Sequence, residues 1–505
     1  MRTEYDAAVI GAGLLGCFAA RELVRYGLHT VVLEEREDIC TGISRANSAI
    51  VYTGCDTKPG TIKTEMCVRA NRGFDDLCRE LGVRFSRCGS LMICFGSGGL
   101  EVLKKKYDQG LKNGVQGIRM LGPEETYEME PHLASGIMAS LYAEGTGTVL
   151  PWELCCAAAE NAAANGAEFR FDSRVTGVTR SAGEYTIRTT SGDIRTRSVI
   201  DCAGLFADEI QEMLFEPTVR LFPKRGDYYV LDTKAQGYIS HVIFHEPEDK
   251  KKSDEFDKGG DKGLTLVPTV EGNILVGPSN MPADDKRSRA TERDGFELLD
   301  RRISEVVPDL PMRHMIRSFS SLRPNPFNVE LSGGGYVRSG KSISNFTIME
   351  PGGDPSFLSF IGIKTPGMTC AQQLGRYAAE KLAAYFGAEE DPRFDPVRSA
   401  PVRMADLPLS ERDAIIKTRP DYGRIVCRCR GVSEGEIIDA IRSVPGAVTA
   451  DGIKRRTGAG GGRCQGGFCT QKTIEILARE LGCRPEDITK DGCGSYILTG
   501  GETDA

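Results

Sequence analysis

Long apolar runs and a basic excess are both missing from this chain. No uninterrupted apolar stretch approaches the roughly 20 residues that a membrane-spanning helix needs. The first residues, MRTEYDAAVIGAG, lack the basic and apolar stretches of an export signal. A net charge of −7 and a pI of about 5.6 disfavour nucleic acid or an anionic membrane as a partner. We therefore expect a cytoplasmic protein with no direct membrane span.

Size and composition indicate an ordinary globular protein of more than one domain. With 505 residues, the chain exceeds one typical domain, so two or three folded units are expected. Its 40% hydrophobic and 27% charged residues are typical of globular proteins.

Cysteine is abundant, with 17 in the chain. Because no export signal is visible, metal binding or catalysis explains these residues better than a disulfide framework. Most stand singly in apolar segments, where a buried thiol behaves as a small hydrophobic side chain. This group comprises Cys17, Cys78, Cys94, Cys155, Cys156, Cys202 and Cys370.

A strand–helix–strand unit occupies the first forty residues. Residues 6–10 predict a short strand, a helical pattern runs to Tyr26 and ends at Gly27, and residues 30–33 predict a second strand. Between the first strand and the helix, three glycines have the GxGxxG spacing of a dinucleotide-binding turn. The alternation of strands and helices continues to about residue 395, which predicts a large α/β body.

Each glycine of the turn has an expected role. Gly11 permits the tight turn, Gly13 lets the backbone approach a pyrophosphate, and Gly16 lets helix and strand pack closely. The helix N-terminus then offers its amides to phosphate. Glu34 ends the second strand, where its carboxylate would accept hydrogen bonds from an adenosine ribose and disfavour a 2′-phosphate. The motif alone leaves FAD and NAD open.

The rest of the chain divides by composition. Residues 246–262 are highly charged and Gly-rich, and predict a surface loop. Residues 389–421 are rich in Pro, Arg and Asp with weak periodicity, and predict a linker after a body at 1–388. A compact module containing Cys, Gly and Arg is expected at 422–482, followed by a C-terminal tail at 483–505.

Three segments resemble a known family. Residues 41–48 (TGISRANS), 199–208 (VIDCAGLFAD) and 360–369 (FIGIKTPGMT) resemble the flavin-side loop, the second adenine-side strand and the isoalloxazine-covering loop of the D-amino-acid-oxidase superfamily. Members near in pattern include FAD-dependent glycerol-3-phosphate dehydrogenases and L-2-hydroxyglutarate oxidases. The resemblance extends over residues 5–385 and implies FAD as cofactor, bound by a Rossmann-like α/β domain with an interleaved α+β substrate domain.

The resemblance also implies boundaries and cofactor contacts. FAD-binding parts would lie near 1–85, 145–215 and 335–388, and substrate-binding parts near 86–144 and 216–334. The helix after the 360–369 loop would stabilise negative charge on reduced flavin with its N-terminus. The expected cofactor-binding residues are Gly11, Gly13, Leu14, Leu15, Gly16, Glu34, Glu35, Thr41, Ser44, Asn47, Ser48, Val175, Ala203, Gly204, Gly362, Lys364, Thr365, Gly367, Met368 and Thr369.

Basic residues resemble positions that face the flavin in these enzymes. Arg323 stands where relatives bind a substrate carboxylate or phosphate, and an arginine fork suits either group. Lys364 would hold a second oxyanion or polarise the carbon–oxygen centre. For Lys224 and Arg225, a solvated surface charge is an equally good interpretation.

Tyrosine replaces histidine at one expected position. Many relatives have histidine where this chain has Tyr52, whose ordinary pKa near 10 makes it a poor base, so the substrate stays open. Only five histidines occur, and His241 and His245, which follow the expected pocket strand, are the better candidates for a base. The expected catalytic residues are Lys364, Arg323, Arg317, Tyr52, Tyr228 and His245.

Four cysteines form a separate pattern near the C-terminus. Cys427 and Cys429 make a CxC pair, and Cys464 and Cys469 a CxxxxC pair. Four thiolates suit an iron–sulfur cluster, whereas zinc sites more often use CxxC pairs. The spacing and the glycines before Cys464 resemble the bacterioferritin-associated-ferredoxin-like 2Fe–2S domain over residues 424–480, which implies a small helical domain with these four ligands. Cys483 and Cys493 fall outside the pattern.

Basic residues surround the four cysteines in sequence. They would offset the charge of the cluster or receive an acidic partner. These residues are Arg424, Arg428, Arg430, Lys454, Arg455, Arg456 and Arg463.

An FAD domain joined to such a module resembles the catalytic subunit of anaerobic glycerol-3-phosphate dehydrogenases. The implied reaction is hydride transfer from C2 of sn-glycerol 3-phosphate to flavin N5, with electrons leaving through the cluster to a flavoprotein or iron–sulfur partner. A 2-hydroxy acid such as L-2-hydroxyglutarate, or an amino or opine-like acid, is the alternative substrate. A non-catalytic electron-transfer subunit is a further alternative, which the retained Arg323 and Lys364 disfavour.

Overall fold

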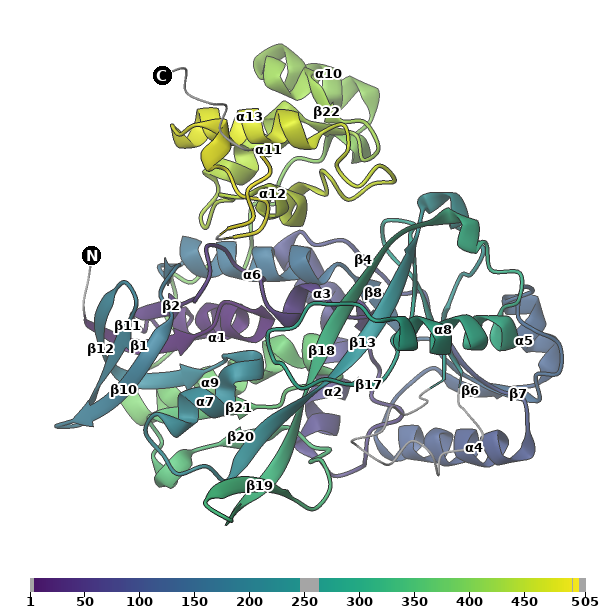
Figure 1. The fold of residues 1–505 in the computed structure, drawn as a ribbon, viewed down its shortest axis with the longest axis horizontal. Coiled ribbons are helices and arrows are strands. Elements are labelled where there is room, and N and C mark those ends of the chain that lie inside the picture. Colours follow the sequence, from purple (N-terminus) through teal and green to yellow (C-terminus); the bar gives the residue numbers. More distant parts are fainter. Residues whose placement is uncertain (1–3, 246–262, 493, 499–505) are drawn as a thin grey trace.

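A computed structural model describes residues 4–245, 263–492 and 494–498. A large body carries a small C-terminal domain on one side (Figure 1). The segment 246–262, which the sequence predicted as a surface loop, and Cys493 lie outside the described residues.

The first sheet has eight strands. Its central strands run parallel in the order β21-β12-β1-β2-β9, and the hairpin β10-β11 pairs with the first half of β12. Apolar residues face both sides of β1 and β2, as expected where helices cover both faces of a parallel sheet. The strands are β1 (Glu4–Ile10), β2 (Thr30–Leu33), β9 (Glu168–Arg170), β10 (Val175–Ser181), β11 (Glu184–Thr189), β12 (Gly192–Asp201), β20 (Thr347–Met349) and β21 (Phe357–Ile361).

Helices bury this sheet, and the predicted strand–helix–strand unit is confirmed as β1, α1 and β2, with α1 ending two residues before Tyr26. α1 packs against α6 and α9. A Cβ on Gly375 would lie 2.8 Å from the Phe18 backbone, so this glycine lets α9 approach α1 closely. The helices of this part are α1 (Leu14–Val24), α2 (Ile62–Arg72), α3 (Phe74–Leu81), α6 (Pro151–Ala164), α7 (Ala207–Glu212) and α9 (Gly367–Phe386).

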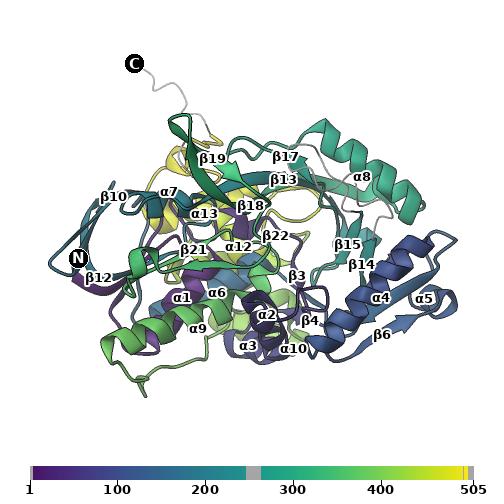
Figure 2. The ribbon, with the colours of Figure 1, turned by 90° about the horizontal axis from the view of Figure 1, so that it is seen from below.

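A second, ten-stranded sheet lies beside the first (Figure 2). Its longest strands, β13 and β18, pair antiparallel along most of their length, which sets Lys224 opposite Arg323 and Tyr228 opposite Phe319. Its strands are β5 (Ser90–Cys94), β6 (Ile118–Leu121), β7 (Ala139–Ala143), β13 (Val219–Leu231), β14 (Val242–His245), β15 (Thr265–Pro268), β16 (Ile274–Val276), β17 (Met281–Pro282), β18 (Met315–Ser332) and β19 (Gly335–Ser339).

Smaller elements complete the body. The accompanying helices are α4 (Ser97–Lys112), α5 (Pro123–Met129) and α8 (Arg293–Val306), and a three-stranded sheet joins β3 (Ile50–Val51), β8 (Gly147–Val149) and β4 (Phe85–Ser86). Short 3₁₀ helices lie at Ile43–Arg45, Gly204–Phe206, Thr233–Ala235, Met312–His314, Pro351–Gly353, Met404–Asp406, Pro420–Gly423 and Pro485–Asp487.

The C-terminal domain has an apolar core of its own, built around Ile437, Ile453, Ile474 and Leu477. Within residues 389–421, expected as a linker, the structure forms a helix, α10 (Leu409–Thr418). The remaining elements are β22 (Ile425–Cys427), β23 (Val432–Ser433), α11 (Glu434–Arg442), α12 (Ala450–Thr457) and α13 (Thr470–Leu481). No helix in the described ranges is both long and apolar enough to cross a membrane.

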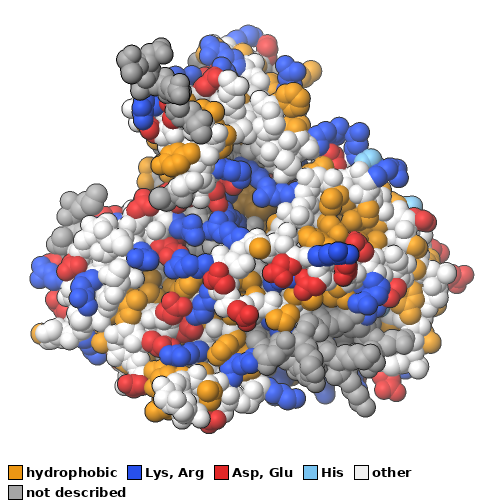
Figure 3. Space-filling view, in the orientation of Figure 1, with side chains coloured by type: hydrophobic (Ala, Val, Ile, Leu, Met, Phe, Trp, Pro, Cys, Tyr) orange, Lys and Arg blue, Asp and Glu red, His pale blue; other side chains and the backbone are white. Residues whose placement is uncertain are grey.

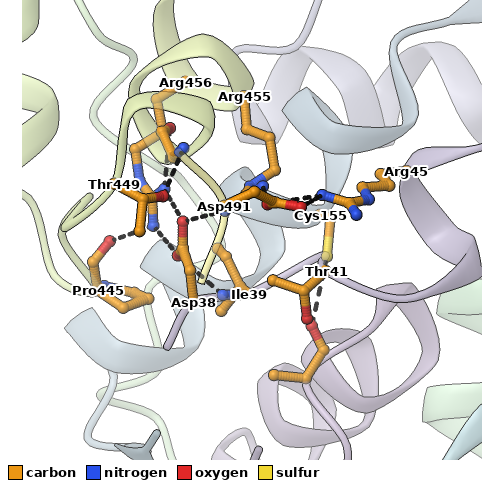
Figure 4. Close-up of polar contacts among 12 residues, drawn as sticks. Asp38, Ile39, Thr41, Arg45, Cys155, Pro445, Thr449, Arg455, Arg456 and Asp491 are labelled. Atoms are coloured by element: carbon orange, nitrogen blue, oxygen red, sulfur yellow. Dashed lines mark hydrogen bonds and ion pairs between the residues drawn. The ribbon is translucent and has the colours of Figure 1, made fainter. Parts of the chain in front are cut away.

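Buried ion pairs fasten α12 to the body. Asp38, which follows β2 and is fully buried, accepts hydrogen bonds from Arg455 at 2.7 Å and from both terminal nitrogens of Arg456 at 2.7 and 2.8 Å (Figure 4). Burial opposes ionisation of Asp38, but these two guanidinium groups outweigh it and hold the pKa of Asp38 below its usual value. The C-terminal domain is therefore docked through charge, not through apolar contact alone.

A second carboxylate extends this connection. Asp491 of the tail forms ion pairs with Arg45 of the body at 2.7 Å and with Arg455 at 3.1 Å (Figure 4). It also pairs with Arg289 of the body at 3.1 Å. Between the two domains the surface is hollowed, and Lys and Arg side chains gather around the hollow (Figure 3).

Candidate active site and iron–sulfur module

A cavity of about 590 Å³ opens at the carboxyl ends of β1, β2 and β12. The three glycines of the first turn have the tight surroundings that the sequence predicted. A Cβ on Gly11 would lie 2.7 Å from the Cys202 carbonyl oxygen, and one on Gly16 would lie 1.8 Å from the Gly11 carbonyl oxygen. Gly11 also has φ +101°, which favours glycine. At Gly13 a Cβ would fill the space 2.9 Å from Ser44 Oγ.

Glu34 lies at one end of this cavity and is buried. Its carboxylate accepts hydrogen bonds from the Ala12 N–H at 2.8 Å and the Arg36 N–H at 3.1 Å. Burial raises the pKa of Glu34 to about 7, although these N–H groups act against it. Val175 lines the same end. A ribose that donated its hydroxyl groups to Glu34 would favour the ionised form, so these residues fit the adenosine end of FAD.

The other end of the cavity lies at the N-terminus of α9. Lys364, Thr365, Gly367 and Met368 line it, and no acidic residue occupies the first turn of α9. The positive end of the helix dipole therefore faces the cavity uncompensated, as the charge on a reduced flavin would require.

Most of the expected cofactor residues meet at this cavity. Those that line it are Gly11, Gly13, Leu14, Leu15, Glu34, Glu35, Thr41, Ser44, Asn47, Ser48, Val175, Ala203, Gly204, Lys364, Thr365, Gly367 and Met368. Gly16, Gly362 and Thr369 stand behind the lining. A Cβ on Gly362 would lie 2.6 Å from Pro326, and the Thr369 hydroxyl accepts a hydrogen bond from the Tyr52 N–H at 3.0 Å.

Two cations share the flavin end of the cavity, and neutral groups hold both. Arg323 donates to Asn280 Oδ1 and to the Ser279 carbonyl, each at 3.2 Å. Lys364 Nζ donates to Asn325 Oδ1 and Ser342 Oγ, each at 3.1 Å. Burial, together with Lys63 and Arg323, lowers the pKa of Lys364 to about 8. Because no carboxylate among the described residues forms an ion pair with either side chain, their charge is available to an anionic ligand.

Tyr52 and Tyr228 complete this end of the cavity. Tyr228 is buried and stacks on Phe319 with ring centroids 4.6 Å apart. Burial raises the pKa of both phenols, so each stays protonated and can only donate or accept hydrogen bonds near neutral pH.

The structure does not bring His245 and Arg317 to this cavity. His245 is buried with its ring against Phe95, at a centroid distance of 5.6 Å. Arg317 is exposed on β18 and donates to Gln465 of the C-terminal domain at 3.3 Å. The other histidine considered as a base, His241, bonds Glu130 at 2.8 Å.

Lys224 and Arg225 are buried, which overturns the interpretation of either as a solvated surface charge. Arg225 forms ion pairs with three carboxylates, so its role is to hold β13 against α8. These partners are Asp227, Glu292 and Asp294.

The four C-terminal cysteines meet as two pairs. Cys429 and Cys464 have sulfur atoms 3.7 Å apart, and Cys427 is hydrogen-bonded to Cys469. That bond lowers the pKa of Cys427 to about 6 against the effect of burial, and backbone N–H groups such as that of Gly460 act in the same direction. Among the described residues, no three His, Cys, Asp or Glu side chains converge as ligands of one metal ion. Two thiol pairs fit a two-iron cluster better than a single zinc ion.

Glycine makes room beside these thiols. A Cβ on Gly462 would lie 2.3 Å from the Cys429 Cβ, so only glycine lets the loop pass there. Cys427 and Cys469 are buried, Cys464 is half-buried and Cys429 is exposed, which places one edge of the site at the surface.

Two family models match the chain. The model described as FAD dependent oxidoreductase matches residues 6–381, and that of the BFD-like 2Fe–2S binding domain matches residues 425–479. The chain belongs to the FAD dependent oxidoreductase family. It carries a 2Fe–2S domain in addition, so the family expected from the sequence and both expected cofactors are confirmed.

Relatives of this flavoenzyme include two groups, one named for activity on glycerol 3-phosphate and one for activity on L-2-hydroxyglutarate. A glycerol 3-phosphate dehydrogenase of Caloramator mitchellensis is 37% identical over 98% of both chains. A glycerol 3-phosphate oxidase of Mycoplasma pneumoniae is 26% identical, covering 75% of this chain and 94% of the relative. A mitochondrial L-2-hydroxyglutarate dehydrogenase of Homo sapiens is 26% identical, covering 60% of this chain and 65% of the relative.

The fold agrees with that of solved flavoenzymes. A dithionite-reduced, FAD-bound L-α-glycerophosphate oxidase from Mycoplasma pneumoniae superposes with a TM-score of 0.69, at 24% identity over 79% of this chain and 99% of that one. The predicted D-amino-acid-oxidase-type body is thereby confirmed as the fold of the flavoenzyme.

Some residues that line the cavity escaped the sequence analysis. Arg36 and Arg287 line the FAD cavity, and no motif contains Arg287. The basic residues near the cluster also have a role that the sequence did not indicate, since several form ion pairs with the body. These pairs are Arg430 with Glu271, Arg455 and Arg456 with Asp38, and Arg463 with Asp232.

Proposed function

We propose that this flavoenzyme oxidises sn-glycerol 3-phosphate to dihydroxyacetone phosphate, and that the electrons leave through the 2Fe–2S domain to a partner protein. The observation that carries the proposal is the position of Arg323 and Lys364 at the flavin end of the cavity, where neither has a carboxylate partner among the described residues. Similarity to a glycerol 3-phosphate dehydrogenase along 98% of the chain supports the choice of substrate.

Arg323 would bind the substrate phosphate. Asn280 and the Ser279 carbonyl hold its guanidinium from one side with neutral acceptors. The remaining N–H groups can therefore donate to phosphate oxygens without breaking an ion pair. Tyr52 and Tyr228 line the cavity beside this position and could donate hydrogen bonds to the substrate.

Lys364 would accept the proton of the C2 hydroxyl. With a pKa of about 8, a substantial fraction of its amines is neutral in weakly basic solution, as a general base requires. FAD, when bound, supplies the acceptor for the hydride that leaves C2 as the C–H bond breaks. Loss of one hydride and one proton converts the alcohol into the ketone.

The 2Fe–2S domain would serve electron transfer to the partner. The exposed Cys429 puts one edge of the thiol site at the surface, and Phe468, within the CxxxxC loop, is 88% exposed. A large exposed aromatic side chain beside a redox site fits a docking surface for an electron acceptor.

Anaerobic flavin bleaching tests the substrate. Glycerol 3-phosphate should bleach the visible flavin band of the purified enzyme, whereas L-2-hydroxyglutarate and amino acids should not. Bleaching by L-2-hydroxyglutarate alone would contradict the proposal and favour a 2-hydroxy acid as the substrate. Similarity to an L-2-hydroxyglutarate dehydrogenase makes this the main alternative.

A cysteine variant tests the electron route. Cys427→Ser should lose iron but keep FAD and anaerobic bleaching by substrate, while reduction of the natural acceptor stops. Cys94→Ser, a buried thiol of the body, is the matched control and should keep its iron. Full acceptor reduction by an iron-free Cys427→Ser enzyme would remove the cluster from the route.

A further inference from the structure

A second cavity, of about 540 Å³, lies between the body and the 2Fe–2S domain. The two cavities share lining residues at 35–36, 41–43, 46–47, 205–206, 287 and 321–322, but this one also has walls of its own. They come from β18 at residues 317–320, from α12 and from residues 458–465 beside the cluster site. Nothing in the proposed oxidation of substrate uses this space.

Positive charge dominates the lining. Ten Lys and Arg side chains face four Asp and Glu side chains, an excess of six. Ion pairs compensate several of these cations; Arg45 and Arg289 bind Asp491, for example, and Arg430 binds Glu271. Carboxylates behind the lining compensate others, as Asp208 does for Lys286 and Asp38 for Arg455. The cations without such partners lie at the hollow between the two domains (Figure 3).

Three of the cations have no carboxylate partner in the described parts of the chain, and one of them, Arg36, also borders the FAD cavity. Lys454 projects from α12 of the 2Fe–2S domain, and Arg317 from β18 of the body. Neither forms an ion pair, and Arg317 has only the neutral amide of Gln465. Burial and the neighbouring charge of Arg317 lower the pKa of Lys454 to about 8. The negative charge of Asp451 raises this pKa, but by less than the other two effects lower it. Such repulsion between Lys454 and Arg317 destabilises the protein unless an anion offsets it.

The rest of the lining suits an organic molecule. Trp152, the only tryptophan of the chain, forms part of the wall together with Phe206 and Phe319. The volume is close to that of the FAD cavity and falls within the range of small-molecule sites, about 300–1,000 Å³. An inorganic ion would leave most of this space unfilled.

We propose that this cavity is a second ligand site for a phosphorylated small molecule, with the phosphate at Lys454 and Arg317 and the organic part against Trp152. A phosphate carries up to two charges and offers several acceptor oxygens, so it can bridge cations from both domains. The ligand would then hold the 2Fe–2S domain and the body together across the cavity. The proposal does not depend on which substrate the flavin site oxidises.

Calorimetric titration of the FAD- and cluster-containing enzyme tests the site. The probes are ADP, glycerol 3-phosphate, inorganic phosphate and, as a carboxylate, L-2-hydroxyglutarate. Lys454→Met and Arg317→Met should each weaken the binding of a phosphorylated probe at this site at least tenfold, because each removes one phosphate contact from a different domain. Lys417→Met, at an exposed lysine of α10, is the matched control and should bind as the parent does.

The probes distinguish the two sources of phosphate. Tight binding of ADP that depends on Lys454 identifies a nucleotide site. Two glycerol 3-phosphate sites per chain, of which Lys454→Met loses one, identify a second site for the metabolite itself. Quenching of Trp152 fluorescence by the same probe would place it in this cavity. An enzyme that binds no phosphorylated probe here, or binds L-2-hydroxyglutarate equally well, would overturn the proposal.

Thermal unfolding gives a second measurement. Without ligand, Lys454→Met should unfold at a higher temperature than the parent, because the substitution removes the charge repulsion and keeps most of the side chain. A lysine with a purely structural role would show the opposite change, which would count against the site. If Lys454→Met does not fold, Arg317→Met tests the same cavity from the body.

Discussion

Arg323 and Arg456 both donate hydrogen bonds from their guanidinium groups, but the acceptors differ in charge. Arg323 donates to an amide and a backbone carbonyl, both neutral, whereas Arg456 donates to both oxygens of the buried Asp38. The charge of Arg456 is compensated within the protein, and it therefore joins two domains. The charge of Arg323 is not compensated within the protein, so it can bind an anionic ligand. The role of each of these two arginines is thus decided by its acceptors.

The largest effect should come from breaking the buried ion pairs of Asp38 with Arg455 and Arg456. Asp38→Ala leaves Arg455 and Arg456 buried without their carboxylate, and breaking a buried pair in this way costs about 3–5 kcal/mol. Urea unfolding should show this loss in the free energy of unfolding, and adding Arg456→Met should recover part of it. Asp76→Ala, which breaks an exposed pair with Arg79, should change stability by less than about 1 kcal/mol. Equal effects at the two positions would mean that the buried pairs do not dock the domain.

The uncompensated arginine should affect activity, not stability. Arg323→Met removes a charged phosphate donor, and we expect kcat/KM to fall by about a hundredfold, or about 2.8 kcal/mol. Steady-state kinetics with glycerol 3-phosphate measure the loss, and thermal unfolding should show no decrease in stability. Arg79→Met, at an exposed position, is the control. Unchanged kcat/KM in Arg323→Met would remove this residue from substrate binding.

The pH dependence of catalysis tests how the uncompensated charge of Arg323 acts on Lys364. Because neutral Lys364 is the proposed base, kcat/KM should rise about tenfold per pH unit below its pKa of about 8 and level off above it. Arg323 contributes to lowering that pKa, so Arg323→Met should shift the rising limb to higher pH. A profile that is flat between about pH 6 and about pH 9 would contradict the role of Lys364 as base.

The smallest effect concerns the neutral acceptor of Arg323. Asn280→Ala removes one of its two hydrogen bonds and should lower kcat/KM by about fivefold, near 1 kcal/mol. Asn280→Asp should do more harm, because a carboxylate there would compensate Arg323 and compete with the substrate phosphate. If Asn280→Asp binds substrate as tightly as the parent enzyme, the neutral charge of this acceptor does not contribute to substrate binding. The inhibition constant of an unreactive phosphate analogue measures the affinity of each variant for the phosphate group directly.

Local patterns predicted much of the FAD site. The glycines at 11, 13 and 16 are constrained by contacts with residues a short distance along the chain or in the adjacent strand, so their spacing carries the information. Lys364 and Arg323 were also expected, and the structure brings them to one cavity. His245 was placed near the pocket only by its position after β13, and the register of β14 turns it toward Phe95 instead.

By itself, the sequence determined the family and both cofactors and predicted four cysteine ligands, because short spacings and turn-forming glycines encode those features locally. Only the tertiary structure showed that Asp38 meets Arg456 across 418 positions of sequence, that Lys454 and Arg317 face one cavity, and which cations are compensated. Ion pairing depends on distance in space and on burial, and neither can be read from the order of residues when the partners lie in different domains.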